Sequence, residues 1–217
     1  MTSESLNEKL KKSIISGQNE EAEKTALEIL KSGIDPLEII TNDLNPTMKL
    51  VGDKFERNEC YLADLMLAAE AMKSAMGVLT PRIMQQGRQL AKLGKVVIGT
   101  VSGDIHDIGK NIVSMLLEVN GFEMCDLGKD VDSMKFIEKT TETQSDIIAL
   151  SALMTTTKPS QKEVVDLLNA MGIRNRYKVM VGGAAITEKW AKQIGADGFG
   201  DTAEQAVRVA QELTAQK

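Results

Sequence analysis

The apolar residues of this chain change their spacing near residue 90, and this change limits the folds that the chain can adopt. Before it they recur every three or four residues, as at Leu6, Leu10 and Ile14, which is the spacing of one face of a helix. After it, short β-branched or apolar runs alternate with amphipathic stretches, which is typical of parallel strands joined by helices. A chain of 217 residues is long enough for two small domains, so we expect an α/β protein with a helical part followed by a sheet.

Residues 1–90 are predicted to form a four-helix bundle. The apolar series place its helices near 6–14, 22–30, 37–48 and 63–79. Asp35 and Pro36 suit the start of the third helix, because Asp caps a helix and Pro is accepted in its first turn. Gly33 suits the end of the second helix, and Pro81 is expected to discourage continuation of the fourth.

Residues 91–217 are predicted to form a flavodoxin-like or Rossmann-like domain with a doubly wound, five-stranded parallel sheet. The strands are expected at 95–100, 123–126, 146–151, 177–181 and 198–199. The helices are expected near 108–120, 131–143, 162–171, 187–194 and 202–214. Ligands of such folds bind at the carboxyl ends of the strands, so the loops that follow the strands are the candidate site.

Composition and charge exclude several classes of protein. The net charge is −5, from 26 basic and 31 acidic residues without long runs of one sign, so nucleic acid is not an expected partner. The first 20 residues carry charges throughout, and no segment reaches the roughly 20 apolar residues of a membrane helix. Cys60 and Cys125 have neither metal-type spacing nor a paired framework, which fits a reducing compartment. We therefore expect a cytoplasmic protein without a membrane partner.

The loop after the first predicted strand, residues 102–111, holds the only histidine of the chain, His106. A lone histidine in a loop is more often structural or exposed than a ligand. Asp104 changes that estimate, because its carboxylate lies two residues earlier and can accept the N–H of one ring nitrogen. Such a partner fixes the tautomer and raises the basicity of the other nitrogen, as in metal-binding imidazoles.

Three motifs at the ends of predicted strands resemble the cobalamin-binding signature of corrinoid proteins, methionine synthase and some mutases. They stand in the family's order, separated by 41 and then 28 residues: Asp104-x-His106-x-x-Gly109, Ser151-x-Leu153 and Gly182-Gly183. Each motif alone is weak, because paired glycines usually mark a turn and Ser-x-Leu is common. The three together, in order and at strand ends, are specific.

The resemblance implies that a cobalamin-type corrinoid binds with its own base displaced from cobalt. His106 would be the axial cobalt ligand, Asp104 its hydrogen-bond partner, and Gly109 the small residue that lets the corrin approach. Ser151 would hydrogen-bond the displaced base, and Gly182-Gly183 would leave room for the nucleotide tail.

Other residues of the same loops are expected to contact the cofactor: Ile105, Asp107, Ile108, Leu153, Thr155 and Thr157. Thr157 is the chosen counterpart of a hydroxyl that relatives place near the Asp–His pair; the alternative is that it only starts a helix.

The helical part resembles the cap domain that covers the upper face of the corrin in the same family. The matching segments are residues 44–55 and 61–72, so the resemblance spans nearly the whole chain. Tyr61 could shield the methyl-bearing face from water. Relatives commonly carry Leu-Pro where this chain has Leu62-Ala63, which leaves the local start of that helix open.

The resemblance implies a corrinoid protein that carries a methyl group on cobalt in anaerobic one-carbon metabolism, of the methylotrophic methanogenesis or acetogenesis type. Its expected partners are a substrate-specific methyltransferase, a second methyltransferase that removes the methyl group, and a reductive activator. The chain would be a carrier subunit and not catalytic alone. The methyl donor could be a methylamine, a betaine, methanol or a methoxylated aromatic compound.

Two other cobalamin functions remain open. The first is the small subunit of a radical mutase, which would account for the second part of the chain but not for the helical cap. The second is a cobalamin-dependent sensor, which usually carries an additional DNA-binding domain with a basic surface. Extraction of the cofactor would discriminate a mutase, because mutases prefer the adenosyl form.

An unrelated flavodoxin-like receiver or flavoprotein shares the fold class but not the function. A receiver needs a phosphorylatable Asp at the end of the third strand, where this chain has Ser151. A dinucleotide site needs a glycine-rich fingerprint, and Gly99, Gly103 and Gly109 are too widely spaced to form one.

Overall fold

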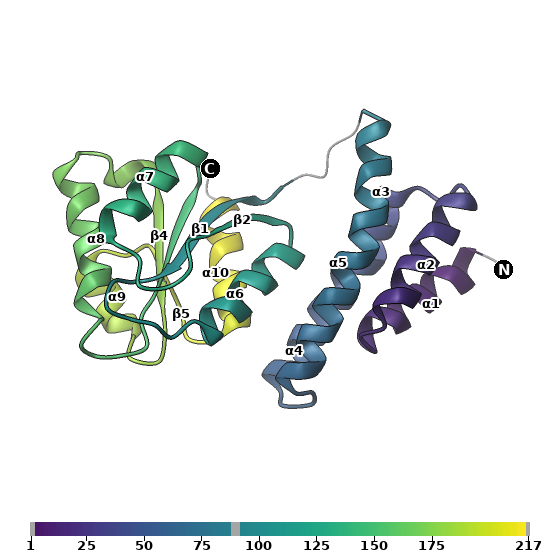
Figure 1. Cartoon of the computed structure of the whole chain (residues 1–217), viewed down its shortest axis with the longest axis horizontal. Helices are drawn as coiled ribbons and strands as arrows, with labels where there is room; N and C mark the ends of the chain where they lie inside the picture. The colour runs from purple at the N-terminus through teal and green to yellow at the C-terminus, as the bar shows by residue number, and fades with distance from the viewer. Residues whose placement is uncertain (1–2, 88–91, 216–217) are drawn as a thin grey trace. The chain divides into compact units, whose positions relative to one another are not determined.

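The computed structural model describes residues 3–87 and 92–215, and the chain divides into two compact units, Met1–Ala91 and Lys92–Lys217 (Figure 1). The predicted domain boundary between residues 90 and 91 lies outside the described residues. Among the described helices, none combines the length and the apolar character that crossing a bilayer requires.

The first unit is helical. Its elements are α1 (Ser3–Ile15), α2 (Asn19–Lys31), α3 (Pro36–Ile39), a π-helical turn (Ile40–Leu44), α4 (Asn45–Glu56) and α5 (Leu62–Gln85). Because α3, the π-turn and α4 follow one another without a break, the unit has the four helical segments that the sequence predicts. The Asp35 carboxylate caps α3 by accepting from the Leu37 N–H at 3.0 Å, and Gly33 follows α2 with a φ of 78°.

The π-turn ends at Leu44, two residues before Pro46, and was not predicted from the sequence. Proline has no N–H, so Pro46 cannot donate to the carbonyl four residues earlier. In the π-turn the Asn45 N–H bonds to the Ile40 carbonyl five residues earlier instead. Ile40 and Leu44 are buried in this turn, so the irregular backbone keeps the apolar face of the segment in the core.

The expectation that Pro81 would discourage continuation of the fourth helix is wrong, because α5 continues through Pro81 to Gln85. Leu79 and Ile83 are both fully buried, one on each side of the proline. The burial of this apolar face stabilises the helix across the hydrogen bond that proline cannot form. Tertiary packing therefore decides where α5 ends. A local sequence pattern carries no information about that packing.

The second unit is a five-stranded parallel sheet with the order β2-β1-β3-β4-β5, and it confirms the predicted doubly wound fold. Its strands are β1 (Gly94–Thr100), β2 (Phe122–Asp126), β3 (Ile147–Ser151), β4 (Lys178–Gly182) and β5 (Gly198–Gly200). Its helices are α6 (Ile108–Val119), α7 (Ser133–Thr143), α8 (Pro159–Ala170), α9 (Glu188–Ile194) and α10 (Ala203–Ala215), with a 3₁₀ turn at Arg174–Arg176.

Helices cover both faces of the sheet (Figure 1). Alternate residues of the inner strands, such as Val97, Ile148 and Val179, form one core with Phe136 of α7 and Val165 of α8. Helices α6 and α10 contact each other, α6 packs on β1 and β2, and α10 packs on β5.

The strand register brings the carboxyl ends of four strands to one edge. Thr100 of β1 pairs with Ser151 of β3, Ser151 pairs with Gly182 of β4, and Gly182 pairs with Gly200 of β5. The loops that hold the three sequence motifs therefore emerge side by side, as expected for the ligand-binding edge of this fold.

Candidate functional site

Asp104, in the loop after β1, is fully buried and accepts hydrogen bonds from two loops. Its Oδ1 accepts from the His106 ring Nδ1 at 2.8 Å and from the His106 backbone N–H at 3.1 Å. Its Oδ2 accepts from the Thr157 hydroxyl at 2.7 Å and from the Leu153 N–H at 2.8 Å, with the Met154 N–H at 3.4 Å. One carboxylate thus joins the loop after β1 to the loop after β3.

These contacts fix the charge of Asp104. Burial alone would raise the pKa of its carboxyl, but hydrogen bonds from the Thr157 hydroxyl, from His106 and from the Leu153 N–H outweigh burial. The net effect holds the pKa of Asp104 well below its usual range. The group is therefore ionised at neutral pH and acts only as an acceptor.

The His106 ring has one nitrogen, Nδ1, held by Asp104, and its side chain is partly exposed. Because the ionised Asp104 can only accept, the His106 Nδ1 carries a hydrogen, and in the neutral ring Nε2 keeps its lone pair. The side chain is 47% exposed, and the Thr100 hydroxyl donates to the His106 carbonyl at 3.1 Å. The imidazole thus has the tautomer and orientation of a metal ligand with a carboxylate partner.

A single imidazole limits what kind of metal can be held here. Within the described ranges there is no group of three or more His, Cys, Asp or Glu side chains placed to hold a metal ion. His106 could therefore serve only a metal whose other ligands come from elsewhere, such as a macrocycle with one axial position left for the protein.

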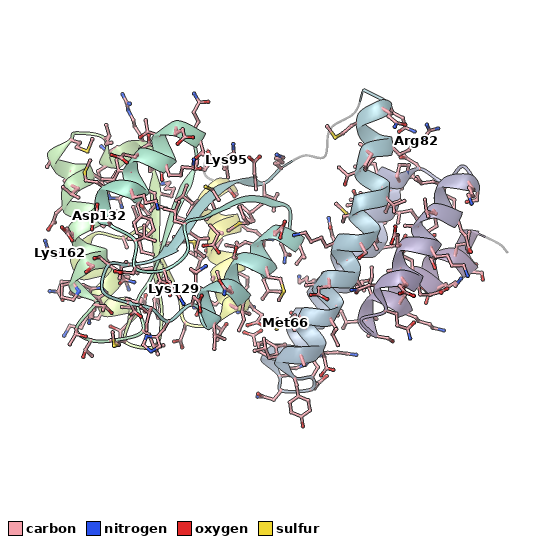
Figure 2. The ribbon with its side chains drawn as sticks, viewed as in Figure 1. Met66, Arg82, Lys95, Lys129, Asp132 and Lys162 are labelled. Atoms are coloured by element: carbon pink, nitrogen blue, oxygen red, sulfur yellow. The ribbon has the colours of Figure 1, made fainter. Side chains whose placement is uncertain are left out.

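The loop after β2 supports the His106 loop from a second side. The Asp130 N–H donates to the Asp104 carbonyl at 2.9 Å, and the Asp130 carboxylate accepts from the Gly103 N–H at 2.7 Å. Lys129, labelled in Figure 2, places its ammonium 4.0 Å from the Asp107 carboxylate. Sequence reasoning missed Asp130; its φ of 53°, which Asp tolerates better than most residues, could not be read from the sequence.

A buried lysine at the start of α6 was also missed. The Lys110 side chain is almost fully buried, and its ammonium pairs with the Asp126 carboxylate at the end of β2 and with the Asn111 side chain. Asp126 in turn accepts from the Gly128 N–H at 2.8 Å, and the Gly128 carbonyl accepts from the Thr100 N–H at 2.9 Å. The pair therefore ties α6 to the loop after β2.

Large apolar side chains are exposed beside His106 in the sequence. Ile105 precedes it in the loop, Ile108 begins α6 two residues after it, and Leu153 follows β3; all three are among the exposed large hydrophobic residues. Gly109, in the first turn of α6, has open space where a side chain would project, with no atom within 4 Å. An exposed apolar surface beside an empty glycine position fits a large, partly apolar ligand better than solvent.

The paired glycines at the end of β4 are required by the neighbouring backbone. Gly183 has a φ of 116°, and a Cβ there would lie 2.1 Å from the Ala152 carbonyl oxygen. A Cβ on Gly182 would lie 3.0 Å from the Gly200 carbonyl oxygen. The sequence predicted that these glycines leave room for a nucleotide tail. The neighbouring backbone alone accounts for them, so that role stays a prediction.

Gln161 of α8 holds the same strand ends from within the core and was not found from the sequence. Its fully buried amide donates to the Leu150 carbonyl at 2.9 Å and to the Gly182 carbonyl at 3.2 Å. The indole N–H of Trp190 donates to the Gln161 side-chain oxygen at 3.0 Å. Ser151, half-buried at the end of β3, follows Leu150 and pairs with Gly182 of β4, so it is next to both carbonyls that Gln161 holds.

Thr155 and Tyr61 are predicted contact residues that take no part in this hydrogen-bond network. Thr155 is exposed in the turn before α8. Tyr61 is exposed at the start of α5 in the helical unit, where its N–H donates to the Asp64 carboxylate at 2.8 Å. That bond stabilises the start of the helix at Leu62, which is followed by Ala63.

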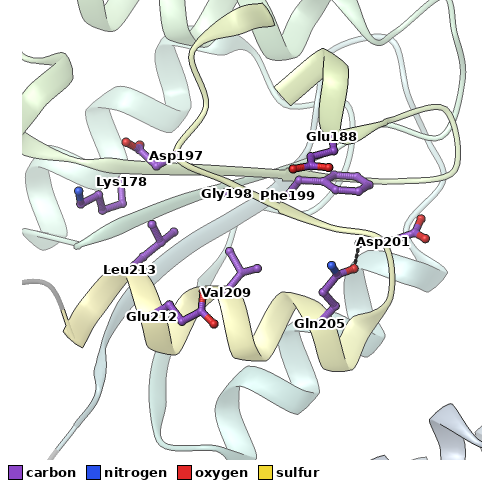
Figure 3. Close-up of a pocket in the computed structure, with 10 residues that line it drawn as sticks. All are labelled: Lys178, Glu188, Asp197, Gly198, Phe199, Asp201, Gln205, Val209, Glu212 and Leu213. Atoms are coloured by element: carbon purple, nitrogen blue, oxygen red, sulfur yellow. Dashed lines mark hydrogen bonds between the residues drawn. The ribbon is translucent and has the colours of Figure 1, made fainter. Parts of the chain in front are cut away.

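A pocket of about 460 Å³ lies along the short edge strand β5 (Figure 3). Its walls come from β4, β5, α9 and α10 and include none of the predicted site residues. Four carboxylates and one lysine line it: Glu188, Asp197, Asp201, Glu212 and Lys178. The pocket is distinct from the His106 loop.

Family models and curated relatives give a consistent comparison. Two models, both described as B12 binding domain, match residues 6–80 and 94–208. Trimethylamine corrinoid protein 2 of Methanosarcina acetivorans is 45% identical over 204 residues, which cover 94% of each chain. Dimethylamine corrinoid protein 2 of Methanosarcina mazei is 47% identical over 212 residues, which cover 98% of each chain.

A solved complex has the same fold in one of its chains. It is the methanol:cobalamin methyltransferase complex MtaBC of Methanosarcina barkeri, with a TM-score of 0.86 and 29% identity. The match covers 98% of this chain and 81% of that chain.

Proposed function

This chain belongs to the family of cobalamin-binding corrinoid proteins, and on that premise we propose that it carries a methyl group on a bound corrinoid between two methyltransferases. When bound, the corrinoid supplies a cobalt centre to which a methyl group can be added and from which it can be removed. The residues of this chain hold, orient and shield that centre. Identity to methylamine corrinoid proteins over nearly the whole chain supports this function over a mutase subunit or a sensor.

The contact between Asp104 and His106 is the observation that carries the proposal. His106 would be the axial ligand of cobalt through Nε2, because its Nδ1 is held by the buried carboxylate. A metal bound at Nε2 would use the lone pair that the contact between Nδ1 and Asp104 leaves on that nitrogen.

The remaining loop residues would receive the rest of the corrinoid. Ile105, Ile108 and Leu153 would cover apolar parts of the macrocycle, and Gly109 would allow its close approach. Ser151 and the strand ends at Gly182-Gly183 would receive the displaced base and the nucleotide tail. Asp107 and Thr155 would contact polar groups at the rim.

The family also suggests partners and a donor. The relative in the MtaBC complex supports a substrate-specific methyltransferase as the first partner. A second methyltransferase and a reductive activator are proposed from the resemblance, as is a capping role for the helical unit, with Tyr61 shielding the methyl group. The names of the trimethylamine and dimethylamine relatives favour a methylated amine as the donor. A cytoplasmic location is proposed from composition alone.

Anaerobic reconstitution with hydroxocobalamin tests the proposal. The wild-type protein is expected to bind the corrinoid with the visible spectrum of a histidine-ligated form, and His106→Ala is expected to bind weakly and lose that spectrum. Asp132→Asn is a matched control on the neighbouring loop, because Asn replaces Asp well at a helix N-cap. An unchanged spectrum in His106→Ala would show that His106 is not the ligand.

The loaded protein is then combined with methyltransferases specific for trimethylamine, dimethylamine, monomethylamine and methanol. Methyl transfer with an amine-specific enzyme supports the proposed donor. Transfer only with the methanol-specific enzyme, or with none of them, contradicts it.

A further inference from the structure

Glu204, in the first turn of α10, is a buried residue, and one oxygen of its carboxylate has no hydrogen-bond partner among the described residues. The residue is only 9% exposed, and its Oε1 is buried without a hydrogen-bond partner. Across the described residues, 3–87 and 92–215, no donor reaches that oxygen. Removing a carboxylate from water without giving it a partner is costly, so nearly all buried polar groups are hydrogen-bonded. Folding alone would favour an apolar residue at this position.

The direction of Glu204 follows from the contacts of α10 with the sheet. A Cβ on Gly200 would touch Ala206, and a Cβ on Gly198 would touch Val209 and Leu213, so these three residues face β5. Glu204 precedes Ala206 by two residues, which is roughly 200° around a helix, so it points away from β5. Helix α10 also contacts α6, and the two lie next to each other (Figure 1).

Glu204 therefore lies in the first turn of one of the two helices that form the seam between α6 and α10. Helix α6 begins at Ile108, just after the His106 loop, and α10 begins at Ala203, just after β5. Because both strands are parallel, both helices begin at the carboxyl edge of the sheet. Gly109, in the first turn of α6, has no atom within 4 Å of the place where its side chain would be. An open position on one helix and an unpaired acceptor on the other stand at the same end of the seam.

We propose that Glu204 accepts a hydrogen bond from an N–H or O–H donor on the nucleotide tail of the bound corrinoid, and so selects corrinoids whose tail offers such a donor. This inference rests on the proposed function. The tail is the part of the ligand expected at this edge, near the strand ends that pair through Gly182 and Gly200. The phosphate of the tail is excluded as the partner, because two negative charges repel each other strongly where little water is present to screen them. The donor is therefore on the base or on the ribose.

Affinity measurements with four corrinoids test the proposal. Cobinamide lacks the nucleotide tail, cobalamin has a dimethylbenzimidazole base without a free donor, and the adenine and hydroxybenzimidazole analogues carry N–H₂ and O–H donors. Binding is followed by visible absorbance for the wild type, Glu204→Leu and Glu204→Gln. Glu212→Leu is the matched control, because Glu212 is an exposed glutamate on the same helix.

Glu204→Leu is expected to bind tail-bearing corrinoids about tenfold or more weakly, as for the loss of a hydrogen bond to a charged group, while cobinamide binding stays unchanged. Glu204→Gln keeps a neutral acceptor and is expected to lie between the two. If only the donor-bearing bases are affected, the donor is on the base; an equal loss for all three tail-bearing corrinoids places it on the ribose. Either result supports the proposal.

The melting temperature of the apo-protein distinguishes a ligand-binding role of Glu204 from a purely structural one. Replacing an unpaired buried carboxylate by Leu is expected to raise the melting temperature of the apo-protein while it weakens tail binding. Unchanged affinity for every tail-bearing corrinoid, or an equal loss with cobinamide, would overturn the role of Glu204. Failure of the wild type to bind even cobinamide would instead contradict the proposed function, so the two failures are distinguishable.

Discussion

Two buried carboxylates lie near the same edge of the sheet but have opposite surroundings. Asp104 accepts hydrogen bonds from His106, Thr157 and the Leu153 N–H, and these hold its pKa low. Glu204 has a buried oxygen that no described residue reaches. The hydrogen bonds of Asp104 are supplied by the protein itself, whereas a partner for the Glu204 oxygen would have to come from outside the described residues. The region of Asp104 is built before the ligand arrives, and the region of Glu204 is finished by it.

Asp104→Asn should give the largest effect on stability, because it removes buried hydrogen bonds that the Asp104 carboxylate accepts. The Asn side chain keeps one acceptor but turns an NH₂ group toward other donors, so buried hydrogen bonds are lost. We expect the free energy of unfolding of the apo-protein, measured with urea, to fall by about 3 kcal/mol. Asp132→Asn, with its cap preserved, should change it by less than about 0.5 kcal/mol. Equal stability of Asp104→Asn and the wild type would mean that the hydrogen bonds of Asp104 contribute little.

Lowering the pH should remove a smaller part of the contribution that Asp104 makes to the stability of the protein. The pKa of Asp104 is lowered by folding, so its ionised form favours the folded state. This contribution is fully present above the ordinary Asp pKa, near about 4, and is lost as the pH falls from there toward the folded value. Urea titrations from neutral pH to about pH 3 should therefore show a steeper loss of stability in the wild type than in Asp104→Asn.

Other carboxyls do not disturb this comparison. Glu21, Glu123 and Glu188 also have lowered pKa values, each chiefly because a lysine hydrogen-bonds to it. Both proteins contain all three, so their contribution cancels in the difference. Parallel pH profiles for the wild type and Asp104→Asn would contradict a lowered pKa at Asp104.

The two regions also differ in how well the sequence predicts them. Asp104 and His106 are two residues apart, so a motif in one loop is enough to suggest their contact. The surroundings of Glu204 depend on how α10 packs on distant parts of the chain, including its seam with α6, which begins about 95 residues earlier. Local pattern carries no information about which donors such a seam excludes. For that reason the sequence suggested the Asp–His pair and gave no signal for Glu204.

The same distinction accounts for the fold. All five strands and their helices follow from local periodicity, because each element has its own apolar pattern. The continuation of α5 through Pro81 was predicted wrongly, and the π-turn before Pro46 was not predicted. Both are decided by the burial of Leu79, Ile83, Ile40 and Leu44 against other helices. Gln161 was missed for the same reason, since its partners lie on two other strands.

Gly109→Ala should give the smallest effect on stability. It tests most directly whether a ligand occupies the space beside the first turn of α6. The new methyl group meets no atom within 4 Å, and Ala is the better helix former, so the apo-protein should gain up to about 1 kcal/mol. If a corrinoid occupies that space, its affinity should fall in the same variant. Visible titration and urea unfolding measure the two quantities.

Substitutions at two other glycines serve as comparisons for the stability and corrinoid affinity of Gly109→Ala. Gly77→Ala is a matched control, because Gly77 lies within α5 and its side-chain position is also empty, so it should gain stability without losing corrinoid affinity. Gly183→Ala should lose stability, because its Cβ would collide with the Ala152 carbonyl. Gly109 would thus behave like Glu204: a poor choice for the free fold, retained where a ligand completes the structure. Undiminished affinity in Gly109→Ala would place the corrinoid away from the first turn of α6 and remove the link between that opening and Glu204.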